Sequence, residues 1–463
     1  MKNTKITATI YPYNRTVSSI VRYADFISKY EIVSTIVPNG FDIDGKDISL
    51  LEKREKLGKV GVLSFVEGIK ACETLIVADI ECSEQFQKVI IKNIIYAMQQ
   101  KKDILSLYRF SESQEQLLNE MSKIYLVNYE SYKQWKVLSL PYSNSRSETY
   151  APIILVAGLN EDCMKFDLQL QLRKSLLEAG YKVSQIGTKH YVELFGFHSF
   201  PEFMFDSSLT INDRVVGLNT YVRDIEKKEG PEVIIIGIPG GLIPITEKIH
   251  QNYGQIAYEV GYALQADFSI LTTQPMVNFD MTSIFERVKF LLGMEPCCVA
   301  MSNIRLNQEA TKLGYQGIST DIIEVKEVDE IVESKQNELN VPIVNISKSL
   351  NDNIVADIIV EKVEEYYKSM CIPSNDSLIK VNENTDLQTW MEKIVYKLFP
   401  DLNKNLGIEQ NWSMLRANEI LYIIAEIAKA YDELISSEEI SKGLTNSYHQ
   451  FIDLLSNKIK ATQ

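Results

Sequence analysis

A glycine followed at a distance by a lysine is the pattern in this sequence that most suggests chemistry. Gly158 follows an apolar strand expected over 153–156. Lys165 opens a helix expected over 165–178, and Asn160 lies in the loop between them. In a phosphate-binding loop, backbone N–H groups at a helix N-terminus surround the phosphate, a glycine permits close approach and a lysine supplies positive charge. The stretch GLNEDCMKF is therefore predicted to be a phosphate-binding loop.

Two positions in this loop lack a group that phosphoryl transfer uses. Met164 places a bulky thioether where glycine usually precedes the lysine, and Phe166 stands where a Ser or Thr hydroxyl holds magnesium. Because phosphoryl transfer depends on lysine and metal together, Lys165 alone is not sufficient. Alternative metal ligands are offered by Asn160, Glu161, Asp162 and Asp167, but acidic side chains would also repel a phosphate. The favoured interpretation is a loop that no longer hydrolyses nucleotide and has no obvious ligand set for magnesium.

The loop spacing resembles that of the dethiobiotin-synthetase-type P-loop enzymes. Gly158 and Lys165 lie one residue further apart than in the common G-x4-G-K-[ST] loop, as they do in that group. The resemblance implies a second strand that ends in an acidic residue and precedes a glycine pair. In 232-EVIIIGIPGG-241 the pair is Gly240 and Gly241, which join the candidate nucleotide- or phosphate-binding residues. Gly237 stands where the acidic residue would be.

Composition and charge restrict the classes of function. A length of 463 residues with 45% hydrophobic residues predicts two or three globular domains with sizeable cores. The net charge of −14 argues against nucleic acid or an anionic membrane as a partner, because both require a basic face. No apolar run approaches the roughly 20 residues of a membrane-spanning helix, and the N-terminus lacks the pattern of a secretory signal. We therefore expect a cytoplasmic protein.

The cysteines and histidines form no recognisable metal or disulfide pattern. The chain has six cysteines without a CxxC spacing, and only four histidines. We expect reduced thiols, no zinc site and no residue set for a catalytic metal centre.

Strands and helices alternate along most of the chain, which predicts an α/β fold. The expected fold class is two three-layer α/β units with mainly parallel sheets, followed by a small helical domain. We place a Rossmann-like domain over 1–148, a degenerate P-loop-NTPase-like domain over 149–370 and the helical domain over 384–463. The polar stretch 139–152 marks the first boundary, because its Ser, Asn and Pro residues give little to bury.

Hydrophobic periodicity gives the elements of the two α/β units. Strands are expected over 5–10, 31–37, 74–79 and 103–108, and then over 153–156, 182–186, 233–236, 268–272, 297–301 and 341–346. Helices are expected over 18–29, 64–72 and 86–99, and then over 165–178, 254–265, 281–292, 305–313 and 352–368. Open α/β sheets bind ligands at the carboxyl ends of their strands, so the loops there are where a site is expected.

Two further polar residues allow alternative interpretations. His190 lies with Glu193 in the aromatic-rich loop 187–205, where it is either an acid–base group or a satisfied histidine beside an aromatic cover. Arg214 either contacts an anionic group or is an exposed helix arginine. The structural alternative is favoured for both.

The last segment resembles an acyl carrier protein from its second helix onward. The stretch 415–458 has a long apolar helix closing on Tyr431, a short polar turn and a last amphipathic helix. The resemblance places the phosphopantetheine-bearing serine of that family at Ala417, which has no hydroxyl, while Ser413 lies too early for the register. An unrelated helical cap is the alternative, since apolar helical stripes are common.

Over nearly its full length the chain resembles the clostridial peptide maturation system proteins, through YPYN, GFDIDGKD, GLNEDCMKF, IPGG and the order of its domains. The resemblance implies a process, the maturation of ribosomally made, Cys-rich, bacteriocin-like peptides, with a precursor peptide or a radical-SAM maturase as partner. We hypothesise an accessory protein whose P-loop-like domain is a scaffold or binds a ligand, a nucleotide being the candidate, and whose helical tail docks a partner. The alternative is an ATP-dependent ligase or kinase of the dethiobiotin-synthetase type with altered metal ligands. Homo-oligomerisation stays open.

Overall fold

The computed structural model describes most of the α/β part of the chain. The described residues are 5–38, 43–80, 82–131, 140–141, 145–245, 249–275, 280–307, 311, 319–348 and 353–370, together with 392 and 395. One compact unit consists of Met1–Arg146 with Ala151–Val360, and a second consists of Ser147–Tyr150 with Glu361–Gln463. Apart from those two positions, the helical domain predicted over 384–463 lies outside the described residues, and so does Ala417.

The N-terminal sheet is fully parallel and has the strand order β3-β2-β1-β4-β5-β6. Its strands are β1 (Ile6–Tyr11), β2 (Tyr30–Ile36), β3 (Gly61–Val62), β4 (Thr74–Val77), β5 (Asp103–Ser106) and β6 (Tyr129–Ser131). Its helices are α1 (Ser18–Arg22), α2 (Phe65–Gly68), α3 (Glu84–Gln99) and α4 (Glu112–Tyr125). The order reverses between β1 and β4, and such a reversal opens a crevice at the carboxyl ends of these two strands. The predicted Rossmann-like α/β architecture is confirmed.

The central sheet is also parallel, in the order β15-β12-β11-β7-β10-β8-β9. Its strands are β7 (Ile153–Gly158), β8 (Val183–Gly187), β9 (His198–Ser199), β10 (Val233–Gly237), β11 (Phe268–Thr273), β12 (Cys298–Met301) and β15 (Ile343–Asn345). Its helices are α5 (Lys165–Glu178), α6 (Ile211–Glu229), α7 (Gln255–Ala263), α8 (Met281–Leu292), α10 (Val325–Lys335) and α11 (Ile354–Met370). Every residue of β7 and β10 is buried, as expected for parallel strands covered on both faces.

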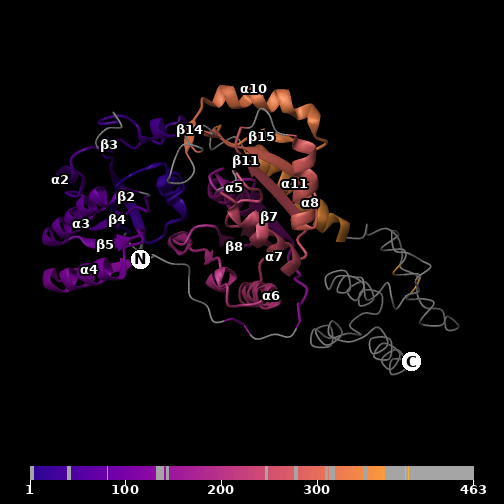
Figure 1. The fold of residues 1–463 in the computed structure, drawn as a ribbon, viewed down its shortest axis with the longest axis horizontal. Coiled ribbons are helices and arrows are strands. Elements are labelled where there is room, and N and C mark those ends of the chain that lie inside the picture. Colours follow the sequence, from indigo (N-terminus) through magenta and orange to yellow (C-terminus); the bar gives the residue numbers. More distant parts are fainter. Residues whose placement is uncertain are drawn as a thin grey trace. The chain divides into compact units, whose positions relative to one another are not determined.

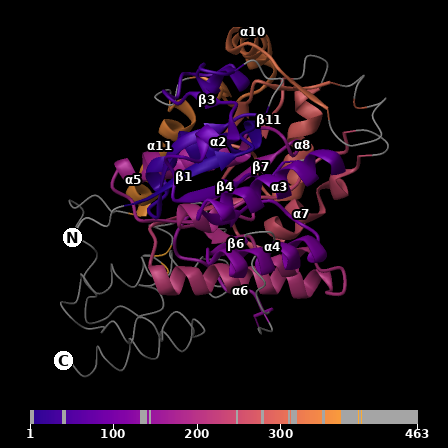
Figure 2. The same ribbon diagram turned by 90° about the vertical axis from the view of Figure 1, so that its left-hand side faces the viewer.

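Helices cover the central sheet through apolar side chains. Residues of α6, α7 and α8 form one core with Ile153, Leu155 and Ala157 of β7, and α7 and α8 lie side by side in both views (Figures 1 and 2). Helix α5 packs beside β7, β8 and β10. The observed arrangement of strands and helices is the α/β fold class that hydrophobic periodicity predicts.

The two sheets share a core within one compact unit. The N-terminal sheet ends at Ser131 and the central sheet begins at Ile153, on either side of the boundary predicted near residue 148. Phe166 and Leu170 of α5 belong to the same buried cluster as Ile10 of β1. The aromatic-rich loop after β8 adds further members to this cluster, namely Tyr191, Val192, Leu194, Phe195 and Phe197.

The start of one predicted helix is wrong. Residues 305 and 306 of the helix expected over 305–313 belong instead to β13 (Ile304–Leu306), which pairs antiparallel with β14 (Thr320–Ile322). Thr311 is helical, and residues 308–310, 312 and 313 lie outside the described residues. The exposed Arg305 stands between a buried and a half-buried apolar residue, so the local alternation is that of a strand edge. Helices α4, α6 and α10 lie outside the predicted elements. Among the described residues, no helix is long and apolar enough to cross a membrane.

Removing the Phe166 ring is expected to destabilise the compact unit. The ring is 3% exposed and makes edge-to-face contacts with Tyr191 and Phe195, with ring centroids 6.2 and 5.4 Å away. Phe166→Ala should lower the free energy of unfolding in chemical denaturation by about 3–5 kcal/mol, since a buried ring leaves a cavity. The matched control is Phe290→Ala, whose ring is 73% exposed and should cost far less. Equal effects of the two substitutions would contradict the shared core.

Candidate functional site

The loop after β7 is held in place by hydrogen bonds at its base. The Leu159 amide donates to the Thr272 carbonyl at 2.8 Å. The Cys163 sulfur lies 2.9 Å from both the Asn160 carbonyl and the Thr272 hydroxyl. The Gln274 amide donates to the Asp162 carbonyl at 2.8 Å. The loop therefore has a fixed shape, and its buried polar groups are largely satisfied by the ends of neighbouring strands.

The end of this loop keeps a backbone conformation that favours glycine, although the residue is methionine. Met164 has φ 62° and ψ 25°, in the left-handed region, and α5 begins directly after it. Left-handed backbone costs a non-glycine residue roughly 1–2 kcal/mol. Among the described residues, no acceptor is recorded for the backbone N–H groups of residues 162–167. A helix N-terminus with unengaged N–H groups is a place where an anion binds favourably.

Of the five candidate contact residues, two have mainly structural roles. Asn160 is 1% exposed, and its side-chain amide donates to Gln274 at 3.2 Å. Gly158 lies at the buried end of β7, where an added Cβ would clash with the Asn160 carbonyl and the Lys165 chain. Asn160 therefore holds the loop closed.

The other three candidates meet at the mouth of the loop. Lys165 is 6% exposed and its ammonium donates to the Gly240 carbonyl. Gly240, with φ 79°, and Gly241 lie in the loop that follows β10, and both line the cavity with Lys165. Gln251 fills the space where a Cβ on Gly241 would stand, and it accepts the Glu161 amide at 2.9 Å. The glycine pair thus permits the close approach that brings β10, the loop and Gln251 together.

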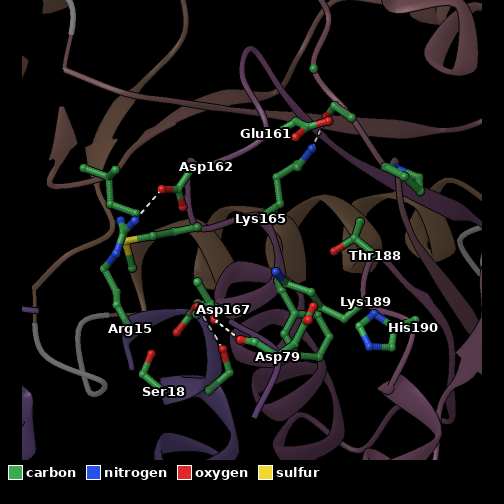
Figure 3. A pocket seen from close by; sticks show the side chains of 18 of the residues that line it. Arg15, Ser18, Asp79, Glu161, Asp162, Lys165, Asp167, Thr188, Lys189 and His190 are labelled. Carbon is green, nitrogen blue, oxygen red and sulfur yellow. Dashed lines mark hydrogen bonds and ion pairs between the residues drawn. The ribbon is translucent and has the colours of Figure 1, made fainter. Parts of the chain in front are cut away.

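These residues line a cavity of about 580 Å³ where the carboxyl ends of both sheets converge. Arg15 follows β1, Asp79 follows β4 and Arg109 follows β5, while Thr188 follows β8 and Pro239 follows β10. Figure 3 shows Arg15 and Asp162 on one side, Thr188, Lys189 and His190 on the other, and Lys165 between them. The cavity thus combines the switch-point crevice of the N-terminal sheet with that of the central sheet. Sequence reasoning found the second crevice from its loop and had no motif for the first.

Charged side chains of both signs line the cavity. The acidic side chains are Glu52, Asp79, Glu161, Asp162 and Asp167, and the basic side chains are Arg15, Arg54, Arg109, Lys165 and Lys189. Asp162 pairs with Arg15 at 2.5 Å, and Asp167 pairs with Arg54 at 3.3 Å. Two of the carboxylates near Lys165, Asp162 and Asp167, are therefore paired with arginines of the N-terminal half, whereas no ion pair is recorded for Glu161 among the described residues.

Lys165 and Lys189 are the lysines of this cavity, and no carboxylate among the described residues pairs with either. Burial lowers the pKa of Lys165, and the nearby Lys189 ammonium lowers it further, while Glu161 and Asp162 act in the opposite direction. Two ammonium groups that repel each other beside a helix N-terminus are stabilised by an anion.

A buried ion cluster, composed of Arg22, Glu52, Arg54 and Asp167, forms one wall. Glu52 lies 2.5 Å from Arg22 and 3.7 Å from Arg54. Ser19 donates to Asp167 at 3.1 Å. The cluster binds the first turn of α5 to the N-terminal half. No group of three or more His, Cys, Asp or Glu side chains among the described residues is arranged to hold a metal ion.

A left-handed turn borders the cavity on the far side of the glycine pair. Gln251, Asn252, Tyr253 and Gly254 all have positive φ, between 48° and 77°. They make up η6 (Gln251–Gly254), which leads into α7. Strained backbone of this kind persists only where its surroundings hold it, and it gathers at ligand-binding sites. The sequence indicates a turn at the start of a helix here, but residue type does not predict its left-handed conformation, because three of the four residues are not glycine.

His190 and Arg214 are both structural. His190 is 4% exposed, and its Nε2 donates to the Leu107 carbonyl at 2.9 Å, which leaves Nδ1 to accept from Arg109 at 3.3 Å. It is thus a satisfied histidine that orients Arg109, the alternative favoured from the sequence. Arg214 is neither exposed nor free for an anion, because it forms a buried bidentate pair with Glu259 at 2.6 and 2.8 Å. Sequence reasoning did not pair Arg214 with Glu259, because the two residues lie 45 positions apart in the chain.

Fold comparisons agree with this α/β assignment. A crystal structure of a DUF1611 family protein from Anabaena variabilis matches with a TM-score of 0.54 at 10% identity, over 78% of this chain and 100% of that one. At this identity the similarity supports the α/β fold alone. Chloroplast FtsY from Physcomitrella patens matches at 14% identity with a TM-score of 0.28, over 61% and 90% of the two chains, too low to carry an argument. No protein family matches the sequence, and no curated protein matches it.

The neutral state of His190 should make stability depend on pH. Burial lowers its pKa below the value of about 6.5 expected in the unfolded chain, so the unfolded chain takes up the proton first. The stability due to the neutral ring is therefore complete above about pH 6.5 and is lost as the pH falls from there toward the folded pKa. Unfolding free energies measured from about pH 8 to about pH 5.5 should show this loss, and His190→Gln should reduce the slope.

The matched control for this pH series is His250→Gln, since His250 is an exposed histidine stacked on Tyr253. It should keep the slope of the unaltered protein. An unchanged slope in His190→Gln would show that this ring is not the group responsible.

Introducing at Gly237 the carboxylate that dethiobiotin-synthetase-type enzymes carry should destabilise the protein for a steric reason. An added Cβ there would clash with the side-chain amide of Gln169, which is fully buried and donates to the Lys165 carbonyl at 3.1 Å and to Thr188 at 3.2 Å. Gly237→Asp should destabilise the protein by about 1–3 kcal/mol through overpacking. Gln169→Ala should relieve part of that cost, with a coupling of about 0.5–3 kcal/mol in a double-mutant cycle. Strict additivity would contradict the contact.

Proposed function

We propose that the cavity binds a phosphate-bearing ligand of the nucleotide type without transferring its phosphoryl group. The observation that carries the proposal is the meeting of Lys165, the unengaged N–H groups of residues 162–167 and a cavity of about 580 Å³ at the N-terminus of α5. Backbone donors, the helix dipole and an ammonium group are the elements of phosphate recognition. The volume lies in the range of small-molecule sites and exceeds what a phosphate alone requires.

Binding requires a change of partner for Lys165. Its ammonium donates to the Gly240 carbonyl, and two further N–H groups remain for a phosphate oxygen. A phosphate carries negative charge, so it competes favourably with a neutral carbonyl for the ammonium. A phosphate would also reduce the repulsion between Lys165 and Lys189.

The residues that would hold magnesium in a phosphoryl-transfer enzyme have other partners. Phe166 points into the core shared with the N-terminal sheet, and the space beside Gly237 is taken by Gln169. Asp162 and Asp167 are paired with arginines. These contacts support binding without hydrolysis over the alternative of an ATP-dependent ligase or kinase, which relies on relocated metal ligands.

We place this binding protein in the maturation of ribosomally made peptides, as an accessory component. The support is the resemblance of the sequence to the clostridial peptide maturation system proteins, and the partner would be a precursor peptide or a radical-SAM maturase. Co-purification of the full chain with a maturase encoded beside it tests this part separately. A maturase that elutes apart from the chain, with and without ATP, would contradict it.

The binding proposal is tested by isothermal titration with pyrophosphate and with ATP, each with magnesium and with EDTA. Both should bind, with similar affinity in the two conditions and without release of phosphate. Lys165→Met should weaken binding at least about tenfold, since it removes a charged hydrogen bond. Lys174→Met is the matched control, because Lys174 is an exposed lysine on the same helix that pairs with Glu178. Binding that requires magnesium and is accompanied by ATP turnover would overturn the proposal in favour of the enzyme alternative.

A further inference from the structure

The wall formed by the buried ion cluster and the nearby Arg15 carries polar atoms that have no partner among the described residues. Among the described residues, no hydrogen bond reaches Glu52 Oε1, Arg54 Nε or Arg15 Nη1. The side chains of Glu52 and Arg54 are only 4% and 6% exposed, and both line the cavity. A buried polar atom without a partner costs stability unless a ligand or water satisfies it. These atoms therefore mark a place where a polar group is expected.

This wall is adjacent to the phosphate position. Arg54 pairs with Asp167 in the first turn of α5, and Arg15 pairs with Asp162 in the loop that leads to Lys165. The wall is therefore attached to the chain both before and after Lys165. A group covalently linked to a phosphate at the N-terminus of α5 would reach it.

A free hydroxyl completes this part of the wall. Ser18 is 4% exposed and lines the cavity beside the cluster (Figure 3). Its side chain has no recorded hydrogen bond within the described part of the chain. Ser19, its neighbour, is committed to Asp167.

The charge of the wall limits the chemistry of its occupant. The cations Arg15, Arg22 and Arg54 face the anions Glu52, Asp162 and Asp167, and they are joined by ion pairs. A charged group of the ligand placed against this wall would find no free counter-charge, because the charges of the wall already compensate one another. The unpartnered atoms include a carboxylate oxygen, which accepts, and guanidinium N–H groups, which donate. The occupant is therefore neutral and offers both donors and acceptors, as hydroxyl groups do.

We infer that the wall formed by Arg15, Ser18, Glu52 and Arg54 is a subsite for the polyhydroxy, sugar part of the phosphorylated ligand. The inference rests on the proposed function, since it places the sugar beside the phosphate held at α5. Both atoms are buried in the structure, so Glu52 Oε1 accepts a hydroxyl proton, and Arg54 Nε donates to a hydroxyl oxygen, once these side chains turn toward the cavity. The N-terminal half thus selects sugar phosphates over inorganic phosphate or pyrophosphate.

Isothermal titration of the full chain with inorganic phosphate, ribose 5-phosphate and ribose tests the subsite. Ribose 5-phosphate should bind at least about tenfold more tightly than phosphate, because it adds several hydrogen bonds. Ser18→Ala should reduce this preference about two- to tenfold, as expected for one lost hydrogen bond, and leave the phosphate affinity unchanged. Glu52→Gln is a second variant that should act in the same direction, with its folding checked by thermal unfolding.

The matched control is Ser175→Ala. Ser175 is a buried serine of α5 whose hydroxyl also lacks a partner among the described residues, but it does not line the cavity. It should leave both affinities unchanged.

The outcomes separate the subsite from the proposed function. Equal binding of phosphate and ribose 5-phosphate, or an equal loss of both in Ser18→Ala, would overturn the sugar subsite while phosphate binding stands. Binding of ribose 5-phosphate that depends on Ser18 but not on Lys165 would retain the subsite and overturn the phosphate position. Absence of binding by all three probes would overturn both.

Discussion

The first turn of α5 is the constraint on which the rest of the structure depends. Successive residues of an α-helix point about 100° apart, so three neighbours face three directions. Lys165 faces the cavity and Gly240, Phe166 enters the core shared with the N-terminal sheet, and Asp167 meets Arg54. The same turn therefore joins the two sheets and forms the wall of the site.

This arrangement explains how the loop keeps its shape without the groups that phosphoryl transfer uses. In a nucleotide-hydrolysing loop the residue after the lysine supplies a hydroxyl to the metal. Here Phe166 occupies that position and contributes buried apolar area, while Gln169 fills the space beside Gly237. Each substitution has a structural partner, so the loop is a maintained part of the fold.

The meeting of two parallel sheets at their carboxyl ends gives the cavity its mixed character. The central half supplies backbone N–H groups and lysines, whereas the N-terminal half supplies arginines, a glutamate and serines. Because Asp162 and Asp167 pair with arginines from the other half, these two residues repel an anion less than their sequence positions suggest. Neutralisation across the two halves is what leaves the lysines available.

The sequence by itself determined the α/β class, the strand–loop–helix around Lys165 and the absence of a hydroxyl at Phe166 and of a carboxylate at Gly237. These features depend on local periodicity and residue type, which are readable along the chain. The bounds predicted for α5 and α8 match those observed, whereas the helix expected over 305–313 was started too early, because a short run of apolar spacing does not distinguish a helix from a hairpin edge. Only the tertiary structure decided that Asn160 holds the loop, that Arg214 is paired with Glu259, and that Glu52 and Arg54 line the same cavity as Lys165. Those facts depend on contacts between residues far apart in the sequence, because the shared core fixes which loops of the two sheets face each other, and periodicity carries no information about such pairings.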